Sequence, residues 1–337
     1  MVTMADRPKT MKAIVRRRWG RPRDVVELVD VPTPEPANDE VLVRVRASSI
    51  NRGDYYALGG VAVLMRPMIG GFLRPKSDRF GGDFAGTAEA VGKNVTDVQP
   101  GEDVFGVRTG AFAEYVAVKT AVARKPANLS FEEAAAVPVA ALTALQALRD
   151  KGNLQAGQRV LVNGASGGVG TFAVQLAKAL GAAHVTAVCS PRNVERARSL
   201  GASLVLDYTR EDYTRRGERY DVIVDVAGNR SWRENRRVLT PDGTLVLAGA
   251  PRGNRLTGPM GRLARLWLTS RVGDRKLVFF ICKPTRPDLA VLRELLEAGK
   301  LRPVVDHVHP ATEIVEALEA MGEGHIQGKL VVRIAGS

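Results

Sequence analysis

A glycine-rich turn at residues 164–170 has the spacing of a dinucleotide-binding loop. Ala165, Gly167 and Gly170 occupy the three fingerprint positions, directly after an apolar strand and at the start of a segment with helical period. Gly167 lets the backbone approach a pyrophosphate, and Gly170 lets helix and strand pack closely. The N–H groups and the dipole at the start of a helix favour the same anion. The alternative is a tight turn without a ligand, but the surrounding strand–helix pattern favours the phosphate site.

The residues that end the next strand predict which dinucleotide binds. An NAD-specific site places a carboxylate about 20 residues after the fingerprint, where it accepts from the ribose hydroxyls. Here Ser190 offers a hydroxyl, Arg192 offers a guanidinium that can pair with a phosphate, and no acid follows in the chain before Glu195. The pattern predicts NADPH rather than NADH. The alternative for Arg192 is a solvated residue at a helix start.

Strands and helices alternate through the middle of the chain, and they must position this loop. Six apolar runs read as strands, at residues 159–163, 184–189, 204–207, 221–226, 244–249 and 277–281. Helical stretches lie between most of them. This rhythm predicts an α/β domain with a doubly wound six-stranded parallel sheet that is covered on both faces.

The chain before and after this region has a different character. Residues 12–130 contain short alternating runs broken by Gly, Pro and Asp, which indicate a β-rich domain. Ser130 and Glu133 have the spacing of a capping box at a helix start, and Pro138 should divide that helix. We therefore expect a catalytic domain at 1–130, a dinucleotide domain at 131–283, and a return to the first domain at 284–337.

The composition bounds the class of protein. The 337 residues are 45% hydrophobic, and no apolar run reaches the roughly 18 residues that span a bilayer. Two distant cysteines make neither a disulfide framework nor a cysteine-rich zinc site, and the first ten residues lack the apolar stretch of a secretory signal. A cytoplasmic protein is expected. The net charge of +13 is spread over the chain without a nucleic-acid motif, so a basic enzyme that attracts anionic ligands is favoured over a nucleic-acid binder.

Four further motifs accompany the glycine turn and carry a family resemblance. They read "INRGD" at 50–54, "GGDFAGTAEAVG" at 81–92, "PGEDVFG" at 100–106 and "GHIQGKLVV" at 324–332. With them, the chain from Met11 to Ile334 resembles the zinc-independent medium-chain dehydrogenase/reductases. It is most similar to the quinone oxidoreductases and their enone-reducing relatives. The stretches "CSPRNVERARSLGA" at 189–202 and "LRPKSDRFGGDFAG" at 73–86 resemble the branch related to the reticulon-interacting mitochondrial oxidoreductase.

The resemblance implies a GroES-like catalytic domain joined to a Rossmann domain, with the nicotinamide in the cleft between them. Phe279 and Phe280 would pack around the nicotinamide pocket or at the edge of a homodimer, and Asn51 and Tyr56 would lie near the nicotinamide. The cofactor-binding residues expected from the resemblance are Thr143, Ala165, Ser166, Gly167, Gly168, Val169, Gly170, Ser190, Arg192, Tyr208, Ala227, Gly249, Phe279, Phe280 and Lys329.

No metal is expected. Zinc-dependent members of the superfamily carry a Cys and a His–Glu pair where this chain has Asn51 and Gly82–Asp83, and one carboxylate with an amide is not a plausible zinc ligand set. The structural zinc lobe is absent as well. His307 and His309 alternate in a strand-like run, where ordinary packing or surface roles are favoured over metal binding.

Without zinc, the residues favour reduction of a small hydrophobic conjugated carbonyl such as a quinone, enone or enal. The negative charge that develops after hydride addition reaches an oxygen that needs only a hydrogen-bond donor or water. Tyr56 is the leading donor, with Asn51 as the orienting group. The alternative is that Tyr56 only stacks on the cofactor. Asp54 is interpreted as structural, with a role in positioning Tyr56 left open.

The sequence also allows other interpretations of one basic stretch and of the whole chain. The basic amphipathic stretch at 252–276 could be a lid, an interface helix or a membrane-surface contact, and packing within the protein is favoured. The whole chain could also be an NADPH-binding sensor or scaffold with little turnover, or an acyl-thioester enoyl reductase.

Overall fold

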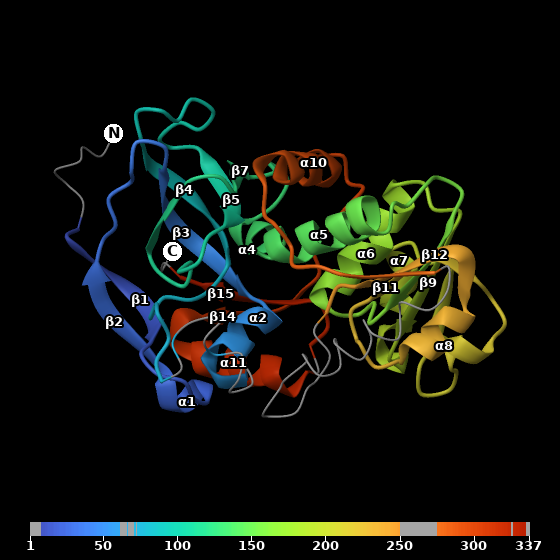
Figure 1. Ribbon diagram of the computed structural model, residues 1–337. Helices are drawn as coiled ribbons and strands as arrows, with labels where there is room; N and C mark the ends of the chain where they lie inside the picture. The colour runs from blue at the N-terminus through green and yellow to red at the C-terminus, as the bar shows by residue number, and fades with distance from the viewer. Residues whose placement is uncertain are drawn as a thin grey trace. The chain divides into compact units, whose positions relative to one another are not determined.

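The computed structural model describes residues 8–60, 66, 71, 73–249, 275–324 and 326–334. Nearly all of the basic stretch at 252–276 therefore lies outside the described residues. The chain forms two compact units (Figure 1). The first comprises residues 1–139, 284–299 and 303–337, and the second comprises residues 140–283 and 300–302. Residues 131–139 thus group with the first unit, although the sequence pattern placed them in the dinucleotide domain.

The first unit is rich in β-structure. Its strands are β1 (Thr10–Arg16), β2 (Val26–Pro32), β3 (Val41–Ile50), β4 (Asp83–Val91), β5 (Asp103–Val107), β6 (Tyr115–Val118), β7 (Val122–Arg124), β14 (Val305–Pro310) and β15 (Lys329–Arg333). Its helices are α1 (Pro22–Val25), α2 (Arg52–Tyr55), the π-helical turn η2 (Tyr56–Gly60), α4 (Phe131–Ala135), α10 (Arg286–Glu297), η7 (Ala311–Glu313) and α11 (Ile314–Glu323).

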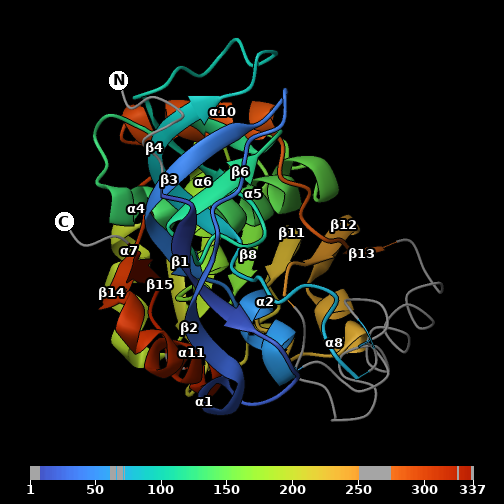
Figure 2. The same cartoon turned by 90° about the vertical axis from the view of Figure 1, so that its left-hand side faces the viewer.

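A seven-stranded sheet brings distant parts of the chain together in this unit. Its order is β14-β15-β3-β4-β5-β7, and β6 also pairs with β3 (Figure 2). The C-terminal strand β15 runs antiparallel to β3, with Leu330 opposite Ile50 and Val331 opposite Ser49. On the other side of β3, Ser49 lies opposite Asp83 of β4. Residues from three distant parts of the sequence thus meet at one end of these strands.

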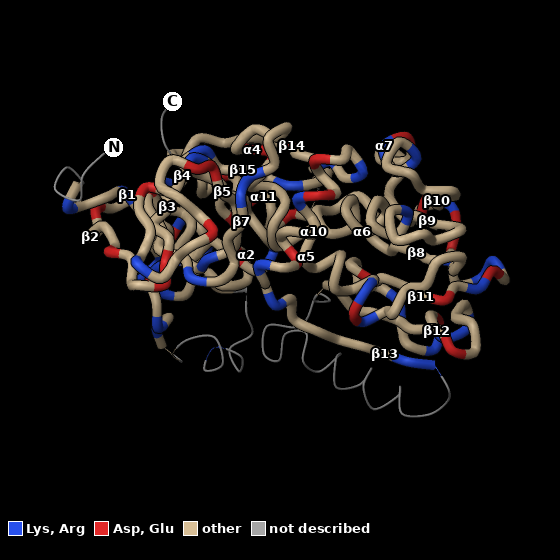
Figure 3. Tube along the Cα trace, turned by 90° about the horizontal axis from the view of Figure 1, so that it is seen from above, with Lys and Arg blue, Asp and Glu red and all other residues tan. Residues whose placement is uncertain are grey.

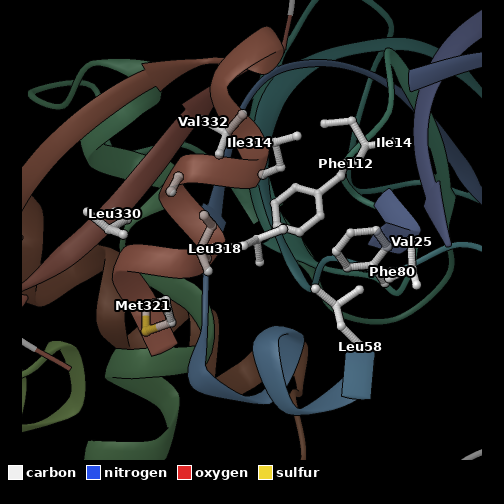
Figure 4. Close-up of a cluster of buried hydrophobic side chains, with 12 residues drawn as sticks. Ile14, Val25, Leu58, Phe80, Phe112, Ile314, Leu318, Met321, Leu330 and Val332 are labelled. Carbon is white, nitrogen blue, oxygen red and sulfur yellow. The ribbon is translucent and has the colours of Figure 1, made fainter. Parts of the chain in front are cut away.

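A hydrophobic cluster fixes the turn that follows β3. Leu58 of η2 is 1% exposed and packs with Phe80, Phe112, Leu318 and other buried side chains (Figure 4). The rings of Phe80 and Phe112 meet edge to face with centroids 5.1 Å apart. Burial of one such leucine contributes about 1.5–3 kcal/mol. The cluster therefore anchors η2, which begins at Tyr56, against α11 and the sheet.

The helix after the β-rich region begins and breaks where its sequence indicates. The Ser130 hydroxyl accepts a hydrogen bond from the Glu133 amide, and the Glu133 carboxylate accepts one from the Ser130 amide. This capping box starts α4, and α5 (Pro138–Leu145) begins at the proline. A proline supplies no N–H and clashes with the preceding turn, so the helix is divided at Pro138. Both features were expected from the sequence.

The second unit alternates strands with helices. Its strands are β8 (Arg159–Asn163), β9 (His184–Cys189), β10 (Leu204–Asp207), β11 (Tyr220–Asp225), β12 (Leu239–Leu247) and β13 (Lys276–Phe279). Its helices and turns are most of α5, η4 (Gln146–Lys151), α6 (Gly168–Ala179), η5 (Pro191–Asn193), α7 (Val194–Ser199), η6 (Tyr213–Arg215) and α8 (Trp232–Arg237).

These strands form one six-stranded sheet in the order β10-β9-β8-β11-β12-β13. Every neighbouring pair is parallel. The order reverses direction between β8 and β11, as in a doubly wound dinucleotide-binding sheet, and ligands bind such sheets at the carboxyl ends of the strands near this point. The predicted mixed α/β fold, with a β-rich domain and a Rossmann-like six-stranded parallel sheet, is confirmed.

Basic residues are distributed along both units. Figure 3 shows Lys and Arg positions interspersed with Asp and Glu along the described trace. Among the described residues, no helix is both long and apolar enough to cross a bilayer.

Candidate functional site

The glycine turn of the second unit presents backbone donors at the start of α6. Gly167 is the N-cap residue, and no side chain caps the helix there. The first amides of a helix have no acceptor within the helix, so those of Gly168 and Val169 can bind an anion. A Cβ atom on Gly167 would meet only the Gly164 carbonyl oxygen, at 3.8 Å. This open backbone with uncapped amides fits the pyrophosphate of a dinucleotide.

Two other glycines close the turn tightly against the sheet. A Cβ atom on Gly170 would lie 2.1 Å from the Gly164 carbonyl oxygen and 2.7 Å from the Ala165 Cα atom. Gly164 has a φ of 87°, in the left-handed region that favours glycine. Any side chain at position 170 would therefore push α6 away from β8. The structure gives Gly170 the packing role that its fingerprint position predicts.

A buried carboxylate joins the loops that follow β8 and β11. Asp225 Oδ1 accepts hydrogen bonds from Asn163 Nδ2 and from the Gly228 amide, both at 2.8 Å. Asn163 Nδ2 also donates to Asn229 Oδ1 at 2.8 Å. Asp225 is fully buried, and these hydrogen bonds offset the free-energy cost of removing its carboxylate from water. They fix the loop that carries Ala227 beside the glycine turn, where the Ala227 amide lies 3.1 Å from a Cβ atom built on Gly164.

Ser190, Arg192 and Tyr208 lie around the carboxyl ends of β9 and β10. Ser190 is the N-cap of η5, and its hydroxyl accepts a hydrogen bond from Asn193 Nδ2 at 2.8 Å. Arg192 is exposed within η5, and Tyr208, directly after β10, is 55% exposed. The Ser190 hydroxyl and the Arg192 guanidinium, on the one loop that follows β9, suit a phosphate group.

The sequence analysis did not identify one acid that lies at the carboxyl ends of β9 and β10. Asp207 lies opposite Cys189 in the parallel pairing of β10 with β9, so a carboxylate does stand next to the strand end that Ser190 follows. Its Oδ1 atom accepts hydrogen bonds from the amide and the hydroxyl of Thr209, at 2.9 and 2.8 Å. Burial, with a smaller contribution from the Asp207 charge, raises the pKa of Cys189 to about 11. No acid follows Ser190 in the chain before Glu195, but the neighbouring strand brings Asp207 to the same place, where its own turn engages it.

The other expected cofactor residues of the second unit have varied surroundings. Thr143 is buried in α5, and Gly249, just after β12, is so close to the Val226 carbonyl oxygen that a Cβ atom would lie 2.1 Å from it. Phe279 is 47% exposed at the end of β13, and the Lys151 ammonium lies 6.0 Å from the Phe280 ring centroid. Their cofactor roles remain predictions.

A separate cluster of polar groups is buried in the first unit. Asn51 follows the end of β3, Asp83 begins β4, and Lys329 begins β15. Because these strands are neighbours in the sheet, the three side chains meet. Asp83 is 0% exposed and Lys329 is 3% exposed, so the cluster holds two opposite charges away from water.

Hydrogen bonds satisfy the charged atoms of this cluster. Asp83 Oδ2 accepts from Ser49 Oγ at 2.6 Å, from Asn51 Nδ2 at 2.9 Å and from Lys329 Nζ at 3.3 Å. Asp83 Oδ1 accepts from the Val139 amide at 2.8 Å. Lys329 Nζ also donates to Asn51 Oδ1 at 2.6 Å and to the Ile50 carbonyl at 3.2 Å.

The resemblance implied that Lys329 contacts the cofactor, whereas in the structure its ammonium is bonded to groups of the first unit. A lysine ammonium has three N–H donors and no acceptor. All three have acceptors inside the first unit, on Ile50, Asn51 and Asp83. Nothing in the sequence signalled this pairing, because Asp83 and Lys329 are 246 residues apart.

Asp54 and Tyr56 lie on the turn next to this cluster. The Asn51 amide donates to Asp54 Oδ2 at 2.8 Å. Burial, reinforced by the nearby Asp83 charge, raises the pKa of Asp54 to about 7, although the Asn51 amide and the Lys329 charge act in the opposite direction. Tyr56, the C-cap residue that follows α2, is half-buried, and its ring centroid lies 6.2 Å from that of Tyr55. The turn thus carries a carboxyl group that changes charge near neutral pH beside the proposed hydrogen-bond donor.

The raised pKa of Asp54 makes stability depend on pH. In the unfolded chain Asp54 titrates near 3.8, and in the folded chain near 7, so between these values the folded state holds the extra proton. The free energy of unfolding should therefore fall as pH rises from 4 to 7 and then level off. We expect Asp54→Asn to remove this slope and to stabilise the protein at pH 8 by roughly 2 kcal/mol.

Urea unfolding of the wild-type protein and of Asp54→Asn at pH 5 and pH 8 measures the difference in their free energies of unfolding. The Asn oxygen can still accept from the Asn51 amide, so the local turn is kept. Equal stability differences between variant and wild type at the two pH values would show that Asp54 titrates in the same way in the folded and unfolded chains.

The side chains that commonly bind metal ions are not grouped together in the described part of the chain. Among the described residues, no group of three or more His, Cys, Asp and Glu side chains lies close enough to share one ion. His307 and His309 are neighbours on β14 with ring centroids 4.6 Å apart, and His309 Nδ1 lies 3.3 Å from Glu313 Oε2. The single buried carboxylate of the cluster, Asp83, is paired with an ammonium instead of a metal-binding partner.

Two family models match the chain. The alcohol dehydrogenase GroES-like domain matches residues 37–127, and the model described as zinc-binding dehydrogenase matches residues 200–332. The second description is that of the family model and does not establish a metal in this chain.

Individual proteins are similar over nearly the whole length. A chloroplastic quinone-oxidoreductase homolog of Spinacia oleracea is 33% identical, with 96% of this chain and 98% of the relative covered. A mitochondrial NAD(P)H oxidoreductase of Mus musculus is 34% identical over 88% of this chain and 82% of the relative. The 2-methylene-furan-3-one reductase of Solanum lycopersicum is 32% identical over 96% and 79%. The structure of the quinone oxidoreductase from Coxiella burnetii superposes with a TM-score of 0.82 at 31% identity, covering 97% of this chain and 100% of that one.

Proposed function

Because this chain belongs to the medium-chain dehydrogenase/reductase superfamily, in its quinone oxidoreductase-like family, we propose that it is an NADPH-dependent reductase of a small hydrophobic conjugated carbonyl. The family is one of NAD(P)H-dependent quinone and enone oxidoreductases. The observation that carries the proposal is the open, uncapped start of α6 in the second unit, which suits the pyrophosphate of a dinucleotide. The Asn51–Tyr56 turn of the first unit carries the polar side chains proposed to act on the acceptor.

Gly168 and Val169 would hold the pyrophosphate of the dinucleotide, which when bound would supply a hydride to the β-carbon of the acceptor. The electron pair of the carbon–carbon double bond would then move toward the carbonyl oxygen, and a proton from solvent would add at the α-carbon. The phenol of Tyr56 donates a hydrogen bond to that oxygen while its negative charge develops. Asn51, fixed by two charged groups, orients the acceptor. We propose that no metal takes part.

We propose NADPH rather than NADH because of the residues around the end of β9. Ser190 and the exposed Arg192 offer a hydroxyl and a cation to a 2′-phosphate, with Tyr208 beside them. Asp207, the acid that the pairing of β10 with β9 brings here, already accepts two hydrogen bonds from Thr209, which turns its Oδ1 atom toward its own loop.

A panel of acceptors tests the reaction. Purified protein should oxidise NADPH in the presence of quinones, enals or enones, and much more slowly with saturated ketones, because Asn51 and Gly82–Asp83 stand where zinc-dependent members carry the ligands of a metal that polarises an isolated carbonyl. The change in absorbance at the NADPH band measures each rate. Tight NADPH binding with no oxidation by any acceptor would favour a sensor or scaffold role, and activity confined to acyl-thioesters would indicate an enoyl reductase.

We also propose a homodimer through the edge of the six-stranded sheet. Among the described strands β13 has β12 as its one neighbour, and apolar side chains near it are open, with Phe279 47% and Ile281 79% exposed. An unpaired strand edge with exposed apolar residues suits pairing with a second copy. The cytoplasmic location and the absence of nucleic-acid and membrane partners remain predictions.

A further inference from the structure

The carboxamide of Asn51 is held between two opposite charges. Lys329 Nζ approaches Oδ1 at 2.6 Å, and Asp83 Oδ2 approaches Nδ2 at 2.9 Å. An ammonium can only donate and a carboxylate can only accept. A half-turn of the amide would place Nδ2 against the ammonium and Oδ1 against the carboxylate, so both bonds would be lost. The pair therefore allows one of the two amide orientations.

The remaining bonds of the cluster keep this arrangement rigid. Asp83 also accepts from Ser49 and from the Val139 amide, and the third Lys329 donor goes to the Ile50 carbonyl. A buried ion pair contributes little net stability unless such bonds satisfy its other donors and acceptors. A pair so fully satisfied, placed on the two strands β4 and β15 that flank β3, is suited to hold a side chain in a fixed direction.

The charges that face the neighbouring turn come from several elements. Asp83 of β4 and Lys329 of β15 act on Asp54 from the sheet, and Asp54 in turn acts on the buried Arg16 at the end of β1. Asp54 accepts from the Asn51 backbone amide, and it also interacts with the Asn51 side chain, so Asp54 belongs to the same cluster. Tyr56, two residues further, starts the π-helical turn that Leu58 anchors.

We propose that Lys329 and Asp83 are positioning residues, which fix the Asn51 carboxamide in one orientation beside Tyr56 so that it can orient the acceptor. The role rests on the proposed reductase function. It differs from the cofactor contact expected for Lys329 from the sequence, since the ammonium has no donor left for a ligand. Lys329 thus acts through Asn51 and touches neither cofactor nor acceptor.

The variant Lys329→Met distinguishes a role in positioning Asn51 from a direct contact with the cofactor. If Lys329 positions Asn51, kcat with NADPH and 4-hexen-3-one should fall about thirtyfold, while the Kd for NADPH stays within about twofold. The matched control Lys93→Met removes an exposed lysine of the same unit and should change neither value. A raised Kd for NADPH with kcat retained would overturn the proposal in favour of a cofactor contact, and unchanged values of both would overturn it outright.

Removal of the ammonium leaves Asp83 buried without its counter-charge, which can prevent folding. If circular dichroism shows that Lys329→Met is unfolded, the double variant Asp83→Asn/Lys329→Met, which buries no net charge, is measured instead. The same thirtyfold fall in kcat supports the proposal, and wild-type kcat contradicts it.

Hydrogen exchange of the Asn51 side-chain amide tests the positioning role without requiring that the protein catalyse the proposed reaction. In protein labelled with ¹⁵N-asparagine, the Asn51 side-chain amide protons should exchange slowly with solvent, and at least tenfold faster in the Lys329→Met or double variant. Equal exchange would overturn the positioning role even if the enzyme is active. If wild-type protein reduces no acceptor while exchange accelerates as expected, the proposed function fails and the fixed orientation of Asn51 stands.

Discussion

Tyr56→Phe is expected to lower turnover of an enone at least tenfold without changing the affinity for NADPH. The phenol supplies the hydrogen bond to the carbonyl oxygen as negative charge develops, and a positioned donor of this kind contributes about tenfold or more to the rate. Phenylalanine keeps the ring and its contact with Tyr55, so the turn should persist. Steady-state kinetics with NADPH and 4-hexen-3-one, together with the NADPH Kd from fluorescence, measure the two effects.

The neighbouring tyrosine provides a matched control. Tyr55 packs against α11 so closely that a Cβ atom on Gly322 would lie 2.6 Å from its ring, so its role is in the packing of the first unit. Tyr55→Phe should therefore leave kcat unchanged. Wild-type turnover in Tyr56→Phe would mean that Tyr56 only stacks on the cofactor, the alternative that its sequence position left open.

Arg192→Ala is expected to raise the KM for NADPH about tenfold or more and to leave the KM for NADH nearly unchanged. A charge-assisted bond to the 2′-phosphate exists only with NADPH, and its loss of about 1.5 kcal/mol or more corresponds to that factor. Initial rates with both cofactors at a saturating acceptor concentration give the two constants.

Arg198→Ala is the control for charge alone. Arg198 is an exposed arginine of α7 whose guanidinium pairs with Glu195 at 2.6 Å. Its removal lowers the charge of the unit by the same amount and should affect both cofactors equally and weakly. If Arg192→Ala changed the two KM values by the same factor, Arg192 would have no part in cofactor choice.

The fold of this chain follows from signals that are local in the sequence. The six apolar strands of the second unit, the capping box at Ser130 and the division of the helix at Pro138 each depend on residues within one or two turns. Gly167 and Gly170 could be assigned because the fingerprint spacing is itself a local geometric requirement. For the same reason, the open start of α6 was predictable.

The arrangement at the two sites depended on pairing between distant strands. The contact of Lys329 with Asp83 and Asn51 requires the order β15-β3-β4 and its register, which no local pattern specifies. Asp207 was overlooked for a related reason, because its approach to Cys189 follows from the parallel pairing of β10 with β9. The raised pKa of Asp54 depends on burial, which the sequence alone does not give.

The destination of the hydride tests the central proposal most directly. NADPH carrying deuterium at C4, in each of its two stereoisomeric forms, is incubated with the protein and 4-hexen-3-one, and the product is examined by NMR. One of the two forms should place deuterium on the β-carbon of a saturated ketone, with a solvent proton on the α-carbon. Deuterium on the carbonyl carbon of an alcohol, or no transfer from either form to any conjugated acceptor, would contradict the account.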